Sequence, residues 1–271
     1  MAALWRKGFI HEANHSRDVY KRQPQGTCSP DLVSIVVAPA MTSVSLAYAN
    51  PLPTTKQQFS ASGTYKDGTT GDVTQCAGWT VSPSIGTISQ IGAFSTGAAG
   101  QYTVTATSDQ VNGSAVITIK LTGSANAGGI TTSLLDATPT GTAPTIAYPI
   151  DGALFPYHFG DLAFQMVPAA GQTIARIAFV GDAIDLDVYA PCTPIANAAI
   201  AGACSVAIPA DLEPSLAGAS EAANLTETVR MASATGASLG ESSSIDARWA
   251  SLSLPGTVYY WSCLLYTSRC V

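Results

Sequence analysis

The sequence predicts an all-β protein made of two β-sandwich domains in tandem, the second of them incomplete. The chain is rich in Thr, Ser, Ala, Gly and Val and poor in Lys, Glu and Arg, which favours short strands over long surface helices. Short runs alternate apolar and polar residues, and turn-forming Gly, Asp and Asn separate them. About 239 residues remain once the two ends of the chain are set aside, enough for two domains of about 100 residues each.

Both ends of the chain resemble translated cloning sequence. Residues 18–23 (DVYKRQ) and 263–268 (CLLYTS) can be encoded by DNA strings that are reverse complements of each other. The strings resemble the mosaic-end adaptor of transposase-made sequencing libraries, and reading further through the adaptor gives Arg269, Cys270, Val271 and a stop codon. We therefore interpret residues 1–23 as an artefactual leader with an adaptor scar, and residues 263–271 as a second scar.

Charge and hydropathy exclude several classes of function. Without the two ends, 6 Lys and Arg residues face 16 Asp and Glu residues, a net charge of about −10. So few scattered cations cannot neutralise a nucleic-acid backbone, so we expect no nucleic-acid partner. We also expect no membrane span, because no apolar run approaches the 18–20 residues that a spanning helix needs.

The first predicted domain covers residues 32–122, after a short lead-in of residues 24–31. Residues 32–40 (LVSIVVAPA) predict a strand that a proline ends, and Phe59 lies on the apolar face of the next alternating run. Trp79 and Tyr102 are the other expected core anchors, since each stands in a strand-like run. Gly68 and the Asn112-Gly113 pair are expected to turn two hairpins.

Several marks of this region occur in a specific order. They are Tyr65-Lys66-Asp67-Gly68, the run DVT, Trp79, the Gly92–Phe94 step and the strand YTVTAT that follows Gly100. In this order they resemble the bacterial Ig-like group 2 family over about 90 residues. The resemblance implies an Ig-like sandwich, surface-exposed and non-catalytic, in bacterial envelope or secreted proteins. It implies no particular ligand, because a fold does not fix a function.

A linker is expected at residues 123–143, which are rich in Gly, Ala, Thr and Pro. The second domain is expected at residues 144–262; within it Ile184, Leu186 and Val188 alternate with polar residues. Its last run, residues 254–262 (LPGTVYYWS), resembles the late strand of fibronectin type III-like sandwiches. A further strand would normally follow that run, so we expect this domain to be truncated and to leave an open sheet edge.

The four cysteines outside the scars are candidates for disulfides. Cys192 and Cys204 flank a loop without strand pattern, which favours a disulfide between them over two buried thiols. Cys28 and Cys76 are the second candidate pair, although Cys28 could instead lie close to a lipid-modified terminus. Cys263 and Cys270 belong to the scar and are left unpaired.

Few residues indicate chemistry. Asp182, Asp185 and Asp187 could hold calcium, but their spacing forms no ligand loop and a solvated strand face is the simpler interpretation. His158 is the only histidine outside the leader, and no hydrolase, zinc-protease or phosphate-loop motif accompanies it. Asn112 and Asn224 match glycosylation acceptors. We therefore predict no catalytic residue, no metal site and no cofactor.

The function expected from these observations is a non-catalytic surface or secreted scaffold for display, spacing or adhesion in a bacterial envelope protein. Its partner would be a protein or a glycan at a cell surface, and its location would be extracellular or in the cell envelope. The alternative is an accessory β-sandwich region of a larger secreted enzyme or propeller protein. Glycan binding would then use exposed aromatics, for which Tyr259 and Trp261 are the candidates because alternation puts them on one face.

Overall fold

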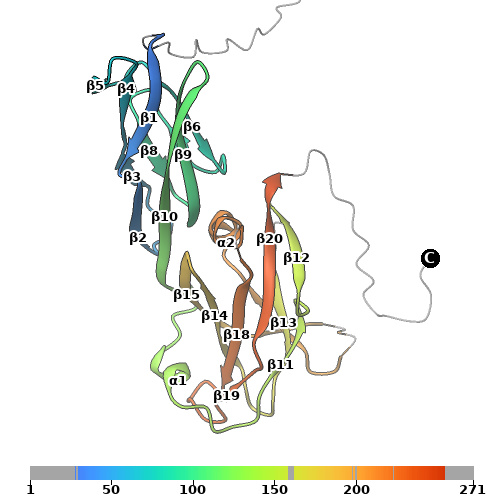
Figure 1. Cartoon of the computed structure of the whole chain (residues 1–271). Coiled ribbons are helices and arrows are strands. Elements are labelled where there is room, and N and C mark those ends of the chain that lie inside the picture. The colour runs from blue at the N-terminus through green and yellow to red at the C-terminus, as the bar shows by residue number, and fades with distance from the viewer. Residues whose placement is uncertain are drawn as a thin grey trace, which may run out of the picture.

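The computed structural model describes residues 28, 30–157, 162–196, 198, 200–221 and 223–253, and it confirms the all-β sandwich fold (Figure 1). Its strands gather into two units, one above the other in Figure 1. The strands of the first unit are β1 Leu32–Ala38, β2 Met41–Ala47, β3 Thr55–Gln58, β4 Ser60–Tyr65, β5 Thr70–Asp72, β6 Gly78–Ser82, β7 Thr87–Ile88, β8 Ala93–Thr96, β9 Gly100–Ser108 and β10 Val111–Ala125.

The second unit contains strands and three short helical segments. Its elements are α1 Ser133–Asp136, β11 Thr145–Tyr148, β12 Ala153–Tyr157, β13 Ala163–Val167, β14 Ile174–Gly181, β15 Ile184–Pro191, β16 Thr193–Pro194, β17 Cys204–Ala207, the 3-10 helix η1 Ala210–Leu212, α2 Glu213–Ala219, β18 Leu225–Ala232, β19 Gly240–Glu241 and β20 Ile245–Ser253. None of the described helices is long and apolar enough to cross a membrane.

The first unit packs strands β6, β9, β10 and β2 against two smaller sheets, β1-β4-β5 and β3-β8-β7. Aromatic side chains fill the space between these layers. The Phe59 and Phe94 rings meet edge to face with centroids 6.4 Å apart, and Phe94 lies 5.2 Å from the Tyr102 ring. Phe59 and Tyr102 are fully buried, whereas Trp79 is half-buried and donates its indole N–H to the carbonyl oxygen of Thr74 at 2.9 Å.

The β9–β10 hairpin turns earlier than the Asn112-Gly113 signal predicts. Strand pairing joins Ser108 to Val111, so the two turn residues are Asp109 and Gln110, and Asp109 has a φ of 51°. Asn112 and Gly113 already belong to β10. A Cβ on Gly113 would lie 2.2 Å from the carbonyl oxygen of Ile35, so this glycine permits close packing of β1 rather than the turn.

The second unit is a sandwich of strands β12-β20-β18-β14-β15 against the sheet β11-β13-β17-β16. Phe164 on β13 meets Phe179 on β14 edge to face, with centroids 5.8 Å apart. Trp249 on β20 stacks on Phe155 of β12 at 5.0 Å. All four side chains are buried, so each layer contributes to the core.

One strand belongs to both units. The first part of β10 pairs with β9 up to the pair Ile119 and Gly100, where β9 begins. Beyond that point β10 continues and pairs in parallel with β15, from Leu121 opposite Ile184 to Ala125 opposite Val188. The result is a single ten-stranded sheet that runs through both units, and its spatial order begins at β12 and ends at β6.

The segment between β10 and β11 packs along the outer face of the second unit. The side chain of Asn126 bonds both backbone groups of Ile130, and Leu135 of α1 is fully buried. Leu135 packs in a small apolar cluster with Ile174, Tyr189, Ala232 and Leu239. Further along, Gly141 donates its N–H to the carbonyl oxygen of Leu239 at 2.7 Å. These contacts tie the connecting segment to the sheet.

Candidate functional site

Within the described residues, the candidate site is the junction between the two units. Its backbone framework is the parallel pairing of β10 with β15. The N–H of Leu121 donates to the carbonyl oxygen of Ala183 at 3.0 Å, and on the other side of β10 the N–H of Tyr48 donates to that of Thr122 at 2.8 Å. Backbone bonds therefore hold the end of β10 from two sides.

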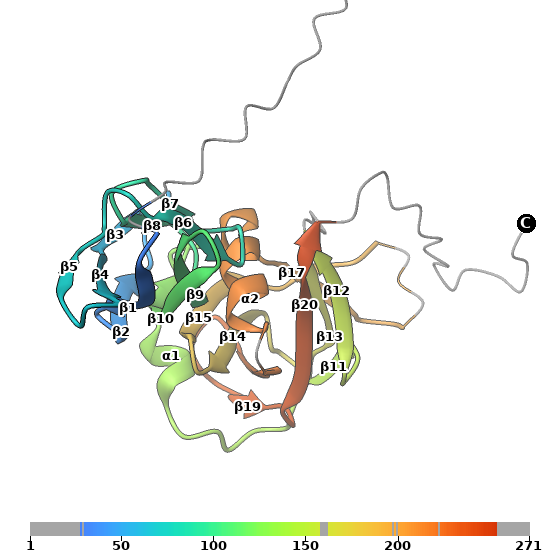
Figure 2. The same ribbon diagram turned by 45° about the horizontal axis from the view of Figure 1, so that its top comes forward.

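Helix α2 occupies the space beside this strand. Figures 1 and 2 both place it between the start of β9 and the strand β20, and it contacts both strands. Pro214 stands in its first turn, where the fixed φ of proline favours a helix start. The helix ends at Ala219, and the N–H of Ser220 after it donates to the carbonyl oxygen of Leu216 at 3.0 Å. Nearly every residue of the helix is buried.

Two glycines set how closely α2 approaches the first unit. A Cβ on Gly218 would lie 2.2 Å from the carbonyl oxygen of Ala99, and one on Gly100 would lie 2.8 Å from that of Gly218. Gly100 also has a φ of 137°, which a residue with a side chain rarely adopts. Next to this contact the Oγ of Ser215 accepts the N–H of Ala99 at 3.1 Å. The helix and the β8–β9 loop thus touch backbone to backbone.

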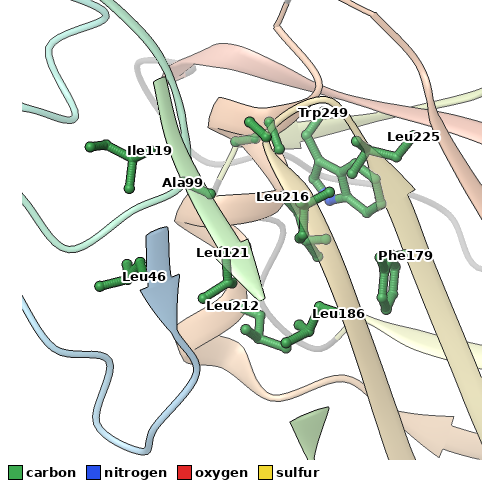
Figure 3. Close-up of a cluster of buried hydrophobic side chains, with 14 of the residues drawn as sticks. Leu46, Ala99, Ile119, Leu121, Phe179, Leu186, Leu212, Leu216, Leu225 and Trp249 are labelled. Carbon is green, nitrogen blue, oxygen red and sulfur yellow. The ribbon is translucent and has the colours of Figure 1, made fainter. Parts of the chain in front are cut away.

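Apolar side chains from both units close the junction (Figure 3). Leu46 and Leu121 come from the first unit, Leu212 and Leu216 from the helical segment of the second, and all four are buried in one continuous core. Burying a leucine side chain contributes about 1.5–3 kcal/mol. Four such side chains are therefore significant against the total stability of a domain, about 5–15 kcal/mol.

A polar pair crosses the junction at its rim. Burial raises the pKa of the Tyr48 phenol, and the negative charge of Asp211 and a hydrogen bond to it raise this pKa further. Tyr48 follows β2 of the first unit, and Asp211 lies in η1 of the second. The phenol therefore stays protonated and can donate to the carboxylate across the boundary.

The structure forms two disulfides. Cys28 is bonded to Cys76 with Cα atoms 5.2 Å apart, and Cys192 to Cys204 with Cα atoms 5.4 Å apart. Because its sulfur is bonded to Cys76, Cys28 offers no thiol for a lipid. Two intact disulfides are typical of proteins in an oxidising compartment.

The acidic residues considered for calcium do not meet at a common point. Asp187 forms an ion pair with the Nε of Arg176 at 2.8 Å, while Asp182 and Asp185 are exposed. The hydroxyl of Tyr189 donates to Asp136 at 2.9 Å, which helps to fasten α1 to the sheet. Within the described ranges, no three His, Cys, Asp or Glu side chains form a group that could hold a metal ion.

Glu227 is a buried acid that none of the sequence motifs indicates. It lies fully buried on β18, and both of its carboxyl oxygens lack a hydrogen-bond partner. Burial, followed by repulsion from Asp246, raises the pKa of Glu227 to about 8. The alternation of LTETVRMA could have revealed it, since Glu227 shares a face with Leu225 and Val229.

Several residues considered from the sequence lie outside the described residues: His158, Tyr259 and Trp261, together with both adaptor-like ends. Asn112 and Asn224 are described, and both are exposed.

Comparison with a family model identifies the first unit. Residues 40–119 match the model of the bacterial Ig-like domain (group 2). The first unit is an Ig-like domain. The match contains every mark named for the sequence resemblance and supports a module of the non-catalytic type.

Solved structures are similar to the chain only at low scores. Drosophila OTK, extracellular domains 3-5, is 12% identical with a TM-score of 0.24, and the alignment covers 80% of this chain and 62% of that one. Sidekick-1 immunoglobulin domains 1-5 is 10% identical at a TM-score of 0.23, covering 81% and 41%. The S-layer protein rSbsC(31-844) is 9% identical at 0.26, covering 81% and 28%. The chain thus spans less than two thirds of each of these three, and scores this low say nothing about how its two units are arranged. No curated protein matches the chain.

Proposed function

We propose that this chain is a rigid two-unit scaffold of a bacterial envelope or secreted protein, used for spacing, display or adhesion. The observation that carries the proposal is the shared sheet, in which β10 leaves the Ig-like domain and pairs with β15 of the second unit. Inter-domain contacts in a flexible chain are usually small and polar. Here the contact is a backbone ladder with a buried apolar core, which suits a part that holds two ends at a fixed distance.

The type of match and the disulfides support the proposed location. The Ig-like domain matches a bacterial family, and both disulfides fit an oxidising compartment outside the cytoplasm. The acidic balance of the chain agrees with a soluble exposed surface.

The described surface offers little support for glycan binding. Among the described residues, the large hydrophobic side chains that are strongly exposed are aliphatic or methionine, such as Met41, Ile150 and Leu154. Exposed aromatic rings can stack on sugar rings, and the aromatic candidates Tyr259 and Trp261 lie outside the described ranges. Spacing or display is supported instead by the shared sheet, in which β10 pairs with both β9 and β15.

The rigidity of the scaffold can be measured directly. Nitroxide-bearing amino acids would replace Ser62 in the Ig-like domain and Ala234 in the second unit, both exposed positions. Electron paramagnetic resonance should then give one narrow distance distribution. The same labels in a Leu216→Asp chain should give a broad one, because a charge replaces a buried leucine at the junction. A broad distribution in the unaltered chain would refute the rigid spacer.

A further inference from the structure

The Ig-like domain does not close its own core at the end that faces the second unit. Strand β9 begins at Gly100, so the last residues of β10 have no partner from β9. Strand β15 takes that place in the sheet. At the same end Ala99 and Leu121 are fully buried, and the side chains that cover them include residues of the second unit (Figure 3).

Helix α2, together with the last residue of η1 before it, supplies this cover. Leu212, Leu216 and Ala217 are fully buried, in the same continuous cluster as the core of the Ig-like domain. The reciprocal contact of Gly100 and Gly218 leaves no space for a side chain between helix and loop. A surface packed this closely resembles the interior of one domain more than the contact of two separate domains.

Backbone donors of the Ig-like domain also depend on the second unit. The N–H of Ala99 is bonded to the Oγ of Ser215, and the N–H of Leu121 to the carbonyl oxygen of Ala183. Without the second unit both donors would need water, and the leucines beside them would be exposed to solvent. Both the polar and the apolar groups at this end of the Ig-like domain thus depend on the second unit.

We propose that α2 is an integral part of the Ig-like domain's core, so that the Ig-like domain is stable only while the second unit is folded. The two units then unfold as one cooperative body. This goes beyond the spacing role, since two units that unfold independently could still be held at a fixed distance.

Hydrogen exchange on the full chain tests this coupling. Met231 is fully buried on β18, where it pairs with Gly240 of β19. Figure 1 shows β19 at the end of the second unit that lies away from α2. Met231→Ala should speed exchange of the slowest amides in the second unit by at least about 30-fold, as expected for a methionine removed from a core. If the units are coupled, the amides of β9 and β6 in the Ig-like domain should speed up by the same factor.

A matched control uses the same chemical change at an exposed position. Met41 of β2 is 80% exposed, so Met41→Ala should leave exchange in both units unchanged. Acceleration by Met231→Ala that is confined to the second unit would overturn the proposal.

The unaltered chain provides a second measurement if Met231→Ala does not fold. In increasing urea the slowest amides of both units should converge on one common unfolding transition. Two separate transitions would overturn the inference. Two transitions combined with a narrow nitroxide distance distribution would overturn the coupling but leave the spacer role intact. A broad distance distribution would by itself refute the spacer role.

Discussion

The two units treat buried polar groups differently. In the Ig-like domain the hydroxyl of Tyr102 donates to the carbonyl oxygen of Ala98 at 3.0 Å, and the indole of Trp79 donates to Thr74. In the second unit the carboxyl of Glu227 and the indole N–H of Trp249 are buried without a partner. All the unpartnered buried side-chain atoms among the described residues belong to this unit.

This difference shows that the two cores are stable for different reasons. An unpaired buried polar group costs about 1–3 kcal/mol, and an ionised one costs more. The Ig-like domain avoids this cost, but it relies on the second unit to close one end of its core. The second unit carries the cost, and its disulfide and the apolar junction help to offset it. Taken alone, the Ig-like domain would lack the cover of one core end, and the second unit would lack the junction contacts that offset its unpaired buried groups.

The largest effect is expected from removing the buried acid. The raised pKa of Glu227 means that the folded state prefers the protonated form. The cost of ionising this carboxyl in the folded state is absent below the unfolded pKa of about 4.5. It grows as the pH rises towards 8 and is complete above 8. Between pH 4 and pH 9, Glu227→Leu should therefore gain roughly 3–5 kcal/mol of stability relative to the unaltered chain. At pH 4 it should keep only the smaller advantage, about 1–3 kcal/mol, of removing an unpaired neutral carboxyl.

Urea unfolding across this pH range measures the effect of Glu227→Leu. Glu221→Leu is the matched control, because Glu221 is exposed and its replacement should not change the pH dependence. If the unaltered chain lost no stability between pH 5 and 9 relative to Glu227→Leu, the buried acid would not set the difference between the cores.

The disulfides allow a second comparison between the units. The Cys28–Cys76 bridge spans a sequence separation of 48 and the Cys192–Cys204 bridge one of 12. By loop entropy, replacing the first pair with alanine should cost about 4 kcal/mol and the second about 3 kcal/mol. Thermal unfolding of the two double variants would show this order. The reverse order would indicate that the Cys192–Cys204 bridge stabilises the second unit by more than loop entropy accounts for.

The sequence predicted the Ig-like domain well because its signals are local. Phe59 and Tyr102 lie on the apolar faces of alternating runs, and both are buried. Gly68, with a φ of 84°, turns the hairpin after β4 as expected. The turn expected at Asn112-Gly113 was wrong, because Asn-Gly is a strong turn signal wherever it occurs. Its glycine is instead required by the carbonyl oxygen of Ile35, a contact from a strand distant in sequence.

The junction could not be predicted with the same ease. Leu212, Pro214 and Leu216 in ADLEPSLAGA do carry a helix signal, namely an early proline and leucines four residues apart. Nothing in that run shows that its Gly218 meets Gly100, more than a hundred residues away in the sequence. The pairing of β10 with β15 is likewise non-local, and its Gly-Ser residues read as the start of a linker.

The smallest effect should come from the hydroxyl of Tyr102. Besides Ala98 it lies 3.1 Å from the Oγ1 of Thr96, and it is fully buried. Tyr102→Phe keeps the ring but removes the donor, which should cost about 1 kcal/mol in urea unfolding. Tyr65→Phe removes the hydroxyl of a half-buried ring in the same domain and should cost less. Because Ala98 and Ala99 lie in the loop that α2 covers, a loss well above 1 kcal/mol would mean that this hydroxyl also supports the junction.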